Sequence, residues 1–156
     1  MRHIIRSRHT RIIATSAVAL VMALAVGVPS AGAGATPAQK TPLTQTNRSC
    51  DSTVIPPTHA QPFGFAVVVK PATNKLVAAV VLQGALPNTT YNIRLIQLLP
   101  DDADCHTVDG TLTTDAWGNG NANVQEPVLP GATSVWVDLN GQLDPDNFYD
   151  TAPVSF

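Results

Sequence analysis

Residues 63–83 read FGFAVVVKPATNKLVAAVVLQ, two valine-rich runs separated by a short polar tetrapeptide. Phe63 to Lys70 and Lys75 to Gln83 consist mostly of β-branched and other apolar residues, over a length typical of strands. The tetrapeptide between them, PATN, is rich in turn-forming residues. We therefore predict a β-hairpin. Because both runs are apolar at nearly every position, we expect both faces of the hairpin to be covered.

The rest of the chain also favours strands. Tyr91 to Leu99 and Thr133 to Leu139 alternate between apolar and polar side chains. Gly110 to Thr114 and Asn121 to Glu126 flank a loop rich in glycine and asparagine, and a short last strand is expected over Pro153 to Phe156. No window shows the three-and-four spacing of an amphipathic helix. The sequence predicts an all-β fold, an antiparallel β-sandwich of six to eight strands.

The N-terminal 33 residues are typical of a cleaved secretory signal peptide. Met1 to Arg11 contains four arginines and no acidic residue, and Ile12 to Val28 contains no charged residue. The small residues that follow offer Ala-x-Ala cleavage sites after Ala33 or Ala35, of which we favour Ala33. An uncleaved signal anchor is the alternative, because the apolar run is at the short limit of a membrane span. We expect a secreted, extracellular protein without a membrane segment after cleavage.

The expected organisation is a signal peptide over 1–33, a flexible linker over 34–49 and a β-sandwich domain over 50–156. The linker sequence is polar, contains two prolines and lacks an apolar period. Cys50 and Cys105 are the only cysteines in the chain. Because the protein is expected outside the reducing cytoplasm, we predict that they form a structural disulfide.

The charge of the chain argues against two kinds of partner. All eleven acidic residues lie at Asp51 or later, whereas four of the nine basic residues lie in the first eleven positions. Without the signal peptide, five basic residues remain against eleven acidic residues, a net charge of −6. Binding to nucleic acid or to an anionic membrane needs clustered Lys and Arg. We therefore expect neither as a partner.

One segment resembles a motif of known β domains. Residues 84–95, GALPNTTYNIRL, resemble the Leu-x-Pro-x-Thr-x-Tyr corner of fibronectin type III and related immunoglobulin-like domains. The resemblance implies that the ring of Tyr91 enters the core and that its hydroxyl bonds back to the turn. In fibronectin type III domains this corner precedes the penultimate strand. Here a long segment follows Tyr91, so the topology cannot be that of a standard fibronectin domain.

A second segment, TLTTDAWGNG at 111–120, resembles the Thr-Thr-Asp-x-x-Gly hairpins of exported bacterial immunoglobulin-like and transthyretin-like domains. Together with the leader and the single cysteine pair, the whole chain resembles small secreted actinobacterial β-sandwich proteins of uncharacterised function. This resemblance implies an immunoglobulin-like sandwich and supplies no catalytic residues.

Acidic loops and two tryptophans are the candidate contact sites. Carboxylate and amide oxygens suit Ca²⁺, and the candidate ligands are Asp138, Asn140, Asp144 and Asp146. Ordinary turns capped by Asp side chains are the alternative explanation, and no other cofactor is expected. Trp117 is expected at a hairpin tip, and Trp136 on the polar side of an amphipathic strand. Exposed aromatic rings there would stack on sugars or anchor a protein, unless a loop covers Trp136.

The sequence favours a non-enzymatic protein. His59 and His106 stand apart in predicted loop regions, and no nucleophile or metal-protease motif is present. The leading prediction is an extracellular binding or structural module whose partner is an extracellular protein or a cell-envelope glycan. The alternative is a secreted proteinaceous hydrolase inhibitor that presents the loop Pro127 to Ala132. A hydrolase with an acidic pair ranks third, because nothing in the sequence places two carboxylates at a defined separation.

Overall fold

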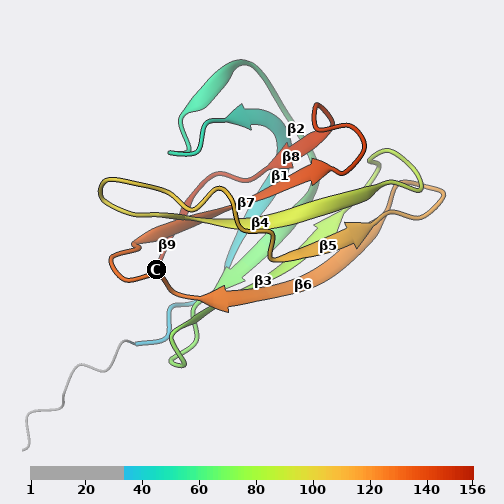
Figure 1. Ribbon diagram of the computed structural model, residues 1–156. Helices are drawn as coiled ribbons and strands as arrows, with labels where there is room; N and C mark the ends of the chain where they lie inside the picture. The colour runs from blue at the N-terminus through green and yellow to red at the C-terminus, as the bar shows by residue number, and fades with distance from the viewer. Residues whose placement is uncertain (1–33) are drawn as a thin grey trace, which may run out of the picture. The chain divides into compact units, whose positions relative to one another are not determined.

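The computed structural model describes residues 34–156, and the predicted signal peptide lies outside the described residues. All regular structure in this range is β-strand, and every strand pair is antiparallel, so the all-β antiparallel prediction is confirmed (Figure 1). The strands are β1 (Gln39–Arg48), β2 (Val54–Val69), β3 (Lys75–Leu82), β4 (Thr90–Leu98), β5 (Gly110–Thr113), β6 (Gly120–Pro127), β7 (Ser134–Gly141), β8 (Phe148–Asp150) and β9 (Val154–Ser155). No helix in this range is long and apolar enough to cross a membrane.

The strands form one continuous sheet. Its order is β5-β4-β7-β8-β1-β2-β3-β6, with β9 paired to β7. The short strand β8 pairs with both β7 and β1, which joins two halves that a sandwich would keep as separate sheets. The result is a nearly closed, barrel-like sheet rather than the predicted sandwich of two sheets, and its nine strands exceed the predicted six to eight.

The edge strands β5 and β6 face each other where the sheet stays open. No β5–β6 ladder is present among the described residues, so these two strands do not form the predicted hairpin; β5 pairs with β4, and β6 pairs with β3. Glycines allow the two edges to approach closely. A Cβ atom at Gly110 would lie 2.6 Å from the side chain of Val124, and one at Gly120 would lie 2.6 Å from that of Leu112. At this seam the two edge strands are therefore joined by side-chain packing and not by backbone hydrogen bonds.

The valine-rich hairpin is confirmed. Strands β2 and β3 pair from Gly64 opposite Leu82 to Val69 opposite Val77. On β3, every second side chain from Leu76 onward is fully buried, while those between them are half-buried. The inner face of the sheet holds the apolar core, which consists of Leu43, Ala66, Val68, Leu76, Ala78, Val80, Leu82, Ala85, Tyr91, Ile93, Leu95, Leu112, Val124, Val135, Val137, Leu139 and Tyr149.

The predicted flexible linker is wrong for residues 39–48, which form strand β1. This strand pairs with β2 over its whole length and with β8 at Thr44. Leu43 is fully buried in the core, and Thr41 and Thr46 are buried on the same strand. The segment looks polar because only a few of its side chains meet the core. Backbone hydrogen bonds to β2, which composition does not reveal, hold the rest of it in the sheet.

Tyr91 is fully buried, as the resemblance to the fibronectin corner implies. Its hydroxyl, however, does not bond back to the preceding turn. It accepts a hydrogen bond of 2.7 Å from Nδ2 of Asn147, in the loop between β7 and β8. The edge of its ring also contacts the ring of Tyr149, with 5.6 Å between centroids. The tyrosine therefore ties a distant loop to the core.

Candidate functional site

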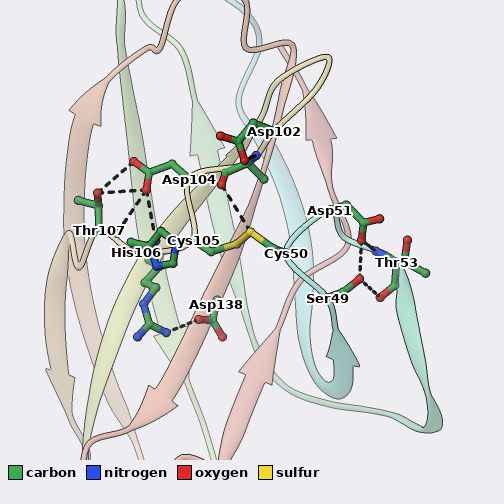
Figure 2. The surroundings of a disulfide bond; sticks show 12 residues. Ser49, Cys50, Asp51, Thr53, Asp102, Asp104, Cys105, His106, Thr107 and Asp138 are labelled. Carbon is green, nitrogen blue, oxygen red and sulfur yellow. Dashed lines mark hydrogen bonds and ion pairs between the residues drawn. A yellow bond between two sulfur atoms is a disulfide. The ribbon is translucent and has the colours of Figure 1, made fainter.

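The predicted disulfide is present and joins two segments outside the sheet. Cys50 follows β1 and Cys105 lies between β4 and β5, with 5.8 Å between their Cα atoms (Figure 2). The turn around Cys50 is held by Asp51, whose side chain accepts hydrogen bonds from the hydroxyl of Ser49 and the backbone N–H of Thr53. These hydrogen bonds, that from Ser49 first, lower the pKa of Asp51.

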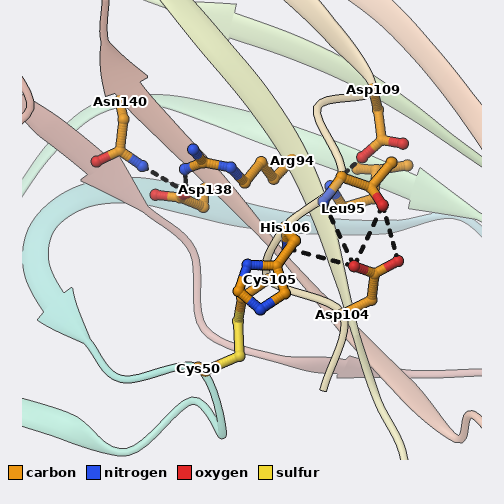
Figure 3. A network of polar contacts seen from close by, with 10 residues as sticks. Cys50, Arg94, Leu95, Asp104, Cys105, His106, Asp109, Asp138 and Asn140 are labelled. Carbon is orange, nitrogen blue, oxygen red and sulfur yellow. Dashed lines mark hydrogen bonds and ion pairs between the residues drawn. A yellow bond between two sulfur atoms is a disulfide. The ribbon is translucent and has the colours of Figure 1, made fainter.

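The acidic residues before Cys105 also form hydrogen bonds that hold the local backbone. The carboxylate of Asp104 accepts hydrogen bonds from the backbone N–H groups of His106 and Thr107 and from the Thr107 hydroxyl (Figures 2 and 3). The side chain of His106 is exposed beside the disulfide. His59 lies on the extension of β2 and lines a different hollow. The two histidines therefore do not converge with an acid.

Below the disulfide lies an open cavity of about 360 Å³, which we call the disulfide pocket. Its floor is the outer face of β4, β7 and β8, the face opposite the core. It is lined by Asn47, Arg48, Cys50, Arg94, Ile96, Cys105, Trp136, Asp138, Asn140, Pro145, Asp146, Phe148 and Asp150. Trp136 is only 3% exposed. Trp136 is therefore not an exposed contact. As the alternative interpretation of the sequence has it, the polar face of its strand is covered, here by the disulfide-linked segments.

Two cross-strand pairs build the polar floor. Arg94 on β4 lies opposite Asp138 on β7, and Nη1 of Arg94 is 2.9 Å from Oδ2 of Asp138 (Figure 3). Asn140, on the same face of β7, donates a hydrogen bond to that oxygen from its side-chain amide. Asp150 on β8 lies opposite Asp138 on the other side. One carboxylate thus lies between a guanidinium group and a second carboxyl group.

The pKa of Asp150 is raised. Only 3% of its surface is exposed, and burial is the main cause that raises its pKa. The charge of Asp138 and a hydrogen bond to that carboxyl group raise the pKa further, and Arg48 only partly offsets this. Two adjacent carboxyl groups cannot both ionise at low cost. The raised pKa favours the neutral form of Asp150.

The two carboxyl groups of this pair make contacts within the protein. The structure places two carboxyl groups together, which the sequence did not indicate. Asp138 is 6% exposed and Asp150 is 3% exposed, and Oδ2 of Asp138 already contacts Arg94 and Asn140. A general acid or base must come within hydrogen-bond distance of the reacting atom. The arrangement fits a buried electrostatic pair.

The four candidate Ca²⁺ ligands are not brought together as a set. Asp138, Asn140 and Asp146 line the disulfide pocket, whereas Asp144 does not. Asp138 is already bound by Arg94, and Oδ1 of Asp144 accepts the backbone N–H of Asp146, as in an ordinary Asp-capped turn. Within residues 34–156, no group of three or more His, Cys, Asp or Glu side chains is arranged to hold a metal ion.

Trp117 is exposed, as predicted, with 78% of its surface accessible, but its loop joins two strands that do not pair with each other and is not a hairpin tip. The loop between β5 and β6 is rigidly built. The carboxylate of Asp115 accepts hydrogen bonds from the backbone N–H groups of Trp117 and Asn119, at 2.8 and 2.9 Å. Gly118 has a φ of 79°, and a Cβ atom there would lie 2.1 Å from the carbonyl oxygen of Ala85. Only glycine fits this close approach.

Two further exposed apolar side chains lie at the same end of the sheet. Leu86, between β3 and β4, is 49% exposed, and Leu143, between β7 and β8, is fully exposed; both border one small hollow. The backbone N–H of Asn88 donates to the carbonyl of Asp115 and so joins the Leu86 loop to the Trp117 loop. All three loops lie at one end of the molecule (Figure 1). We call Trp117, Leu86 and Leu143 the loop-end patch.

Sequence reasoning missed Arg94, Asp150 and Leu143 as site residues. Arg94 faces away from the apolar side of its strand, as the alternation over Tyr91 to Leu99 indicates, but its partner Asp138 was assigned to Ca²⁺. The alternation of both strands was the available signal, since it places a basic and an acidic residue on the same face of the sheet. For Asp150 no sequence signal existed, because its role depends on the register of β8.

Comparison with known proteins identifies no relative of this chain. No protein-family model, no curated protein sequence and no solved structure matches it.

Proposed function

We propose that this is a secreted, non-enzymatic β protein that binds another protein outside the cell through the loop-end patch. The observation that carries the proposal is the exposure of Trp117, 78%, on a loop that hydrogen bonds and Gly118 hold in one conformation. A large aromatic ring that is ordered before binding loses little entropy on association and is typical of binding hot spots.

The neighbours of Trp117 favour a protein partner over a glycan. Leu86 and Leu143 extend the apolar surface across two further loops. Large exposed apolar side chains grouped in one place are unusual on a soluble protein and typical of protein contacts. The signal-peptide pattern and the disulfide support an extracellular location. The net charge of −6 after removal of the leader argues against nucleic acid.

The test is a comparison of two single substitutions. The mature chain, Trp117→Ala and Val108→Ala would each be cross-linked to envelope and culture-medium proteins of the producing cells. Val108 is a matched control, because it is 46% exposed but lies near the disulfide. A protein captured by the wild type would be purified and its affinity measured. We expect Trp117→Ala to weaken that affinity by tenfold or more and Val108→Ala to leave it unchanged.

Equal binding by all three proteins would overturn the proposal. So would sedimentation with purified cell-wall polysaccharide that depends on Trp117 in the absence of any protein partner, since the partner would then be a glycan.

A second candidate function, inhibition of a hydrolase, is favoured by one observation. The loop between β6 and β7 is clamped by Gln97, whose side chain is fully buried. Nε2 of Gln97 donates to the carbonyl of Pro127 at 2.9 Å, and Oε1 accepts the backbone N–H of Leu129 at 2.8 Å. A rigid loop is what a substrate-like inhibitor presents to a protease. Assays against a panel of serine proteases test this candidate, and a lack of inhibition at micromolar protein would exclude it for those enzymes.

A further inference from the structure

The disulfide pocket contains buried polar atoms for which the protein supplies no hydrogen-bond partner. Among the side chains of residues 34–156, six buried nitrogen or oxygen atoms are in this state. Four of them belong to residues that line this one pocket, namely Nε of Arg48, Nε of Arg94, Nε1 of Trp136 and Oδ1 of Asp150. Buried polar atoms are paired in the great majority of cases. Their concentration here points to a partner from outside the chain.

The unpaired atoms define what such a partner must offer. The indole of Trp136 and the guanidinium groups of Arg48 and Arg94 can only donate hydrogen bonds, whereas a carboxyl oxygen of Asp150 accepts them. Trp136 and Asp150 are each only 3% exposed, so their orientation is fixed by packing. A hydroxyl group both donates and accepts. Several hydroxyl groups on one small molecule would satisfy both kinds of atom.

The charged side chains that line the pocket largely offset one another. Arg48 and Arg94 line the pocket together with Asp138 and Asp146, and burial raises the pKa of Asp150, which favours its neutral form. Arg94 and Asp138 form a direct ion pair, with 2.9 Å between Nη1 and Oδ2. A charged ligand would leave an unbalanced charge in a partly buried site, which is unfavourable. The ligand class that fits is therefore electrically neutral.

The size and the apolar surface of the pocket narrow the class of ligand further. A cavity of about 360 Å³ is at the lower end of the range for small-molecule sites. Phe148 and Pro145 add apolar surface at its wall, suited to the C–H face of a ring. We propose that the disulfide pocket binds a neutral polyhydroxylated molecule of the size of one sugar ring. The site lies on the outer face of β4, β7 and β8 and does not depend on the loop-end patch.

The two tryptophans make the proposal directly testable. In the Trp117→Phe protein, Trp136 is the only remaining tryptophan, so its fluorescence reports on the pocket. This protein would be titrated with glucose, galactose, mannose and N-acetylglucosamine, and separately with the charged sugars glucuronate and glucosamine. We expect a saturable change in emission with at least one neutral sugar and none with the charged ones. No saturable change with any neutral sugar at tens of millimolar, or saturation with a charged sugar alone, would overturn the proposal.

A second variant assigns the binding to the pocket. Trp136→Phe removes the indole N–H and keeps an aromatic ring, and its affinity would be measured by ligand-detected NMR against the wild type and Trp117→Phe. We expect the dissociation constant to rise about five- to tenfold, the loss of one hydrogen bond, while Trp117→Phe binds as the wild type does. A melting curve of Trp136→Phe confirms that it folds. If folded Trp136→Phe binds a neutral sugar as tightly as the wild type, the ligand lies elsewhere and the assignment is wrong.

Discussion

Tyr91 and Trp136 show how much a single side chain reveals before the fold is known. The resemblance of residues 84–95 to a tyrosine corner predicts that Tyr91 is buried, and it is. The partner of its hydroxyl, Asn147, lies 56 residues away, and no local pattern could identify it. For Trp136, alternation correctly predicts the outward face of its strand. It could not predict that segments joined by the disulfide would cover that face, because this depends on contacts far apart in the chain.

The bond between Asn147 and Tyr91 gives a prediction at this scale. Tyr91→Phe keeps the ring in the core but leaves the amide of Asn147, which is 7% exposed, without its partner. A buried polar group left unpaired costs about 1–3 kcal/mol. We expect the free energy of unfolding in urea to fall by that amount. Tyr91→Phe combined with Asn147→Ala should cost less than the sum of the two single variants. Strict additivity would mean that the hydrogen bond contributes nothing.

Among the elements, the strands with a clear apolar signal were predictable, and the polar ones were not. The hairpin of β2 and β3 follows from valine-rich runs and a turn tetrapeptide, both of which are local properties. Strand β1 reads QKTPLTQTNR and was assigned to a linker, because a strand that buries few side chains looks like a flexible segment. The edge strands β5 and β6 were located but paired wrongly. Turn chemistry fixes where a strand ends and leaves its partner undetermined.

The open seam between β5 and β6 contains a pair of acidic side chains. Glu126 on β6 is half-buried, and burial, followed by the charge of Asp109, raises its pKa from 4.5 to about 7. Asp109, just before β5, accepts the backbone N–H of Leu95 through its carboxylate, and burial raises its pKa as well. Asp104 adds a smaller repulsion to both carboxyl groups. Above neutral pH, like charges therefore face each other across the seam.

This pair makes the stability of the seam depend on pH. The pKa of Glu126 is higher in the folded chain than in the unfolded chain, so ionisation favours unfolding. Its contribution should fall as pH rises from about 4.5 to 7 and stay constant above that. The free energy of unfolding of Glu126→Gln should equal that of the wild type near pH 4 and exceed it at pH 8 by about 1 kcal/mol. The difference stays this small because solvent screens the charge of a half-exposed group.

Urea unfolding at pH 4 and pH 8 measures this difference. Asp101→Asn, a substitution of an exposed carboxylate, serves as the control and should show no such pH-dependent gain. A Glu126→Gln protein that is equally stable relative to the wild type at both pH values would contradict the prediction.

For the whole molecule, long-range connections decide both the fold and the site. The cysteine pair was predictable from composition and compartment. The pocket beneath it was not, since its walls come from β1, β4, β7 and β8 and from the loop after β7. The short strand β8 determines the architecture, because its pairing with both β7 and β1 makes one sheet of two halves. A three-residue strand carries too little pattern to predict that role.

The disulfide should contribute strongly to the stability of this sheet although it lies outside the apolar core. It spans a sequence separation of 55 residues. A cross-link of that length restricts the unfolded chain by about 4 kcal/mol in the chain-entropy model, a large fraction of the stability of a small domain. We expect Cys50→Ser combined with Cys105→Ser to lower the free energy of unfolding in urea by about that amount. The β-type circular dichroism spectrum should persist, because neither cysteine belongs to the apolar core. The chemically reduced wild type should behave as the double variant does, which separates loss of the cross-link from effects of the serines.

If the unfolding curves of the oxidised and reduced proteins coincide, the bridge does not stabilise the fold. The disulfide-linked segments that cover the outer face of β4, β7 and β8 would then be held in place by their own contacts, Arg48 and the Asp51 turn among them.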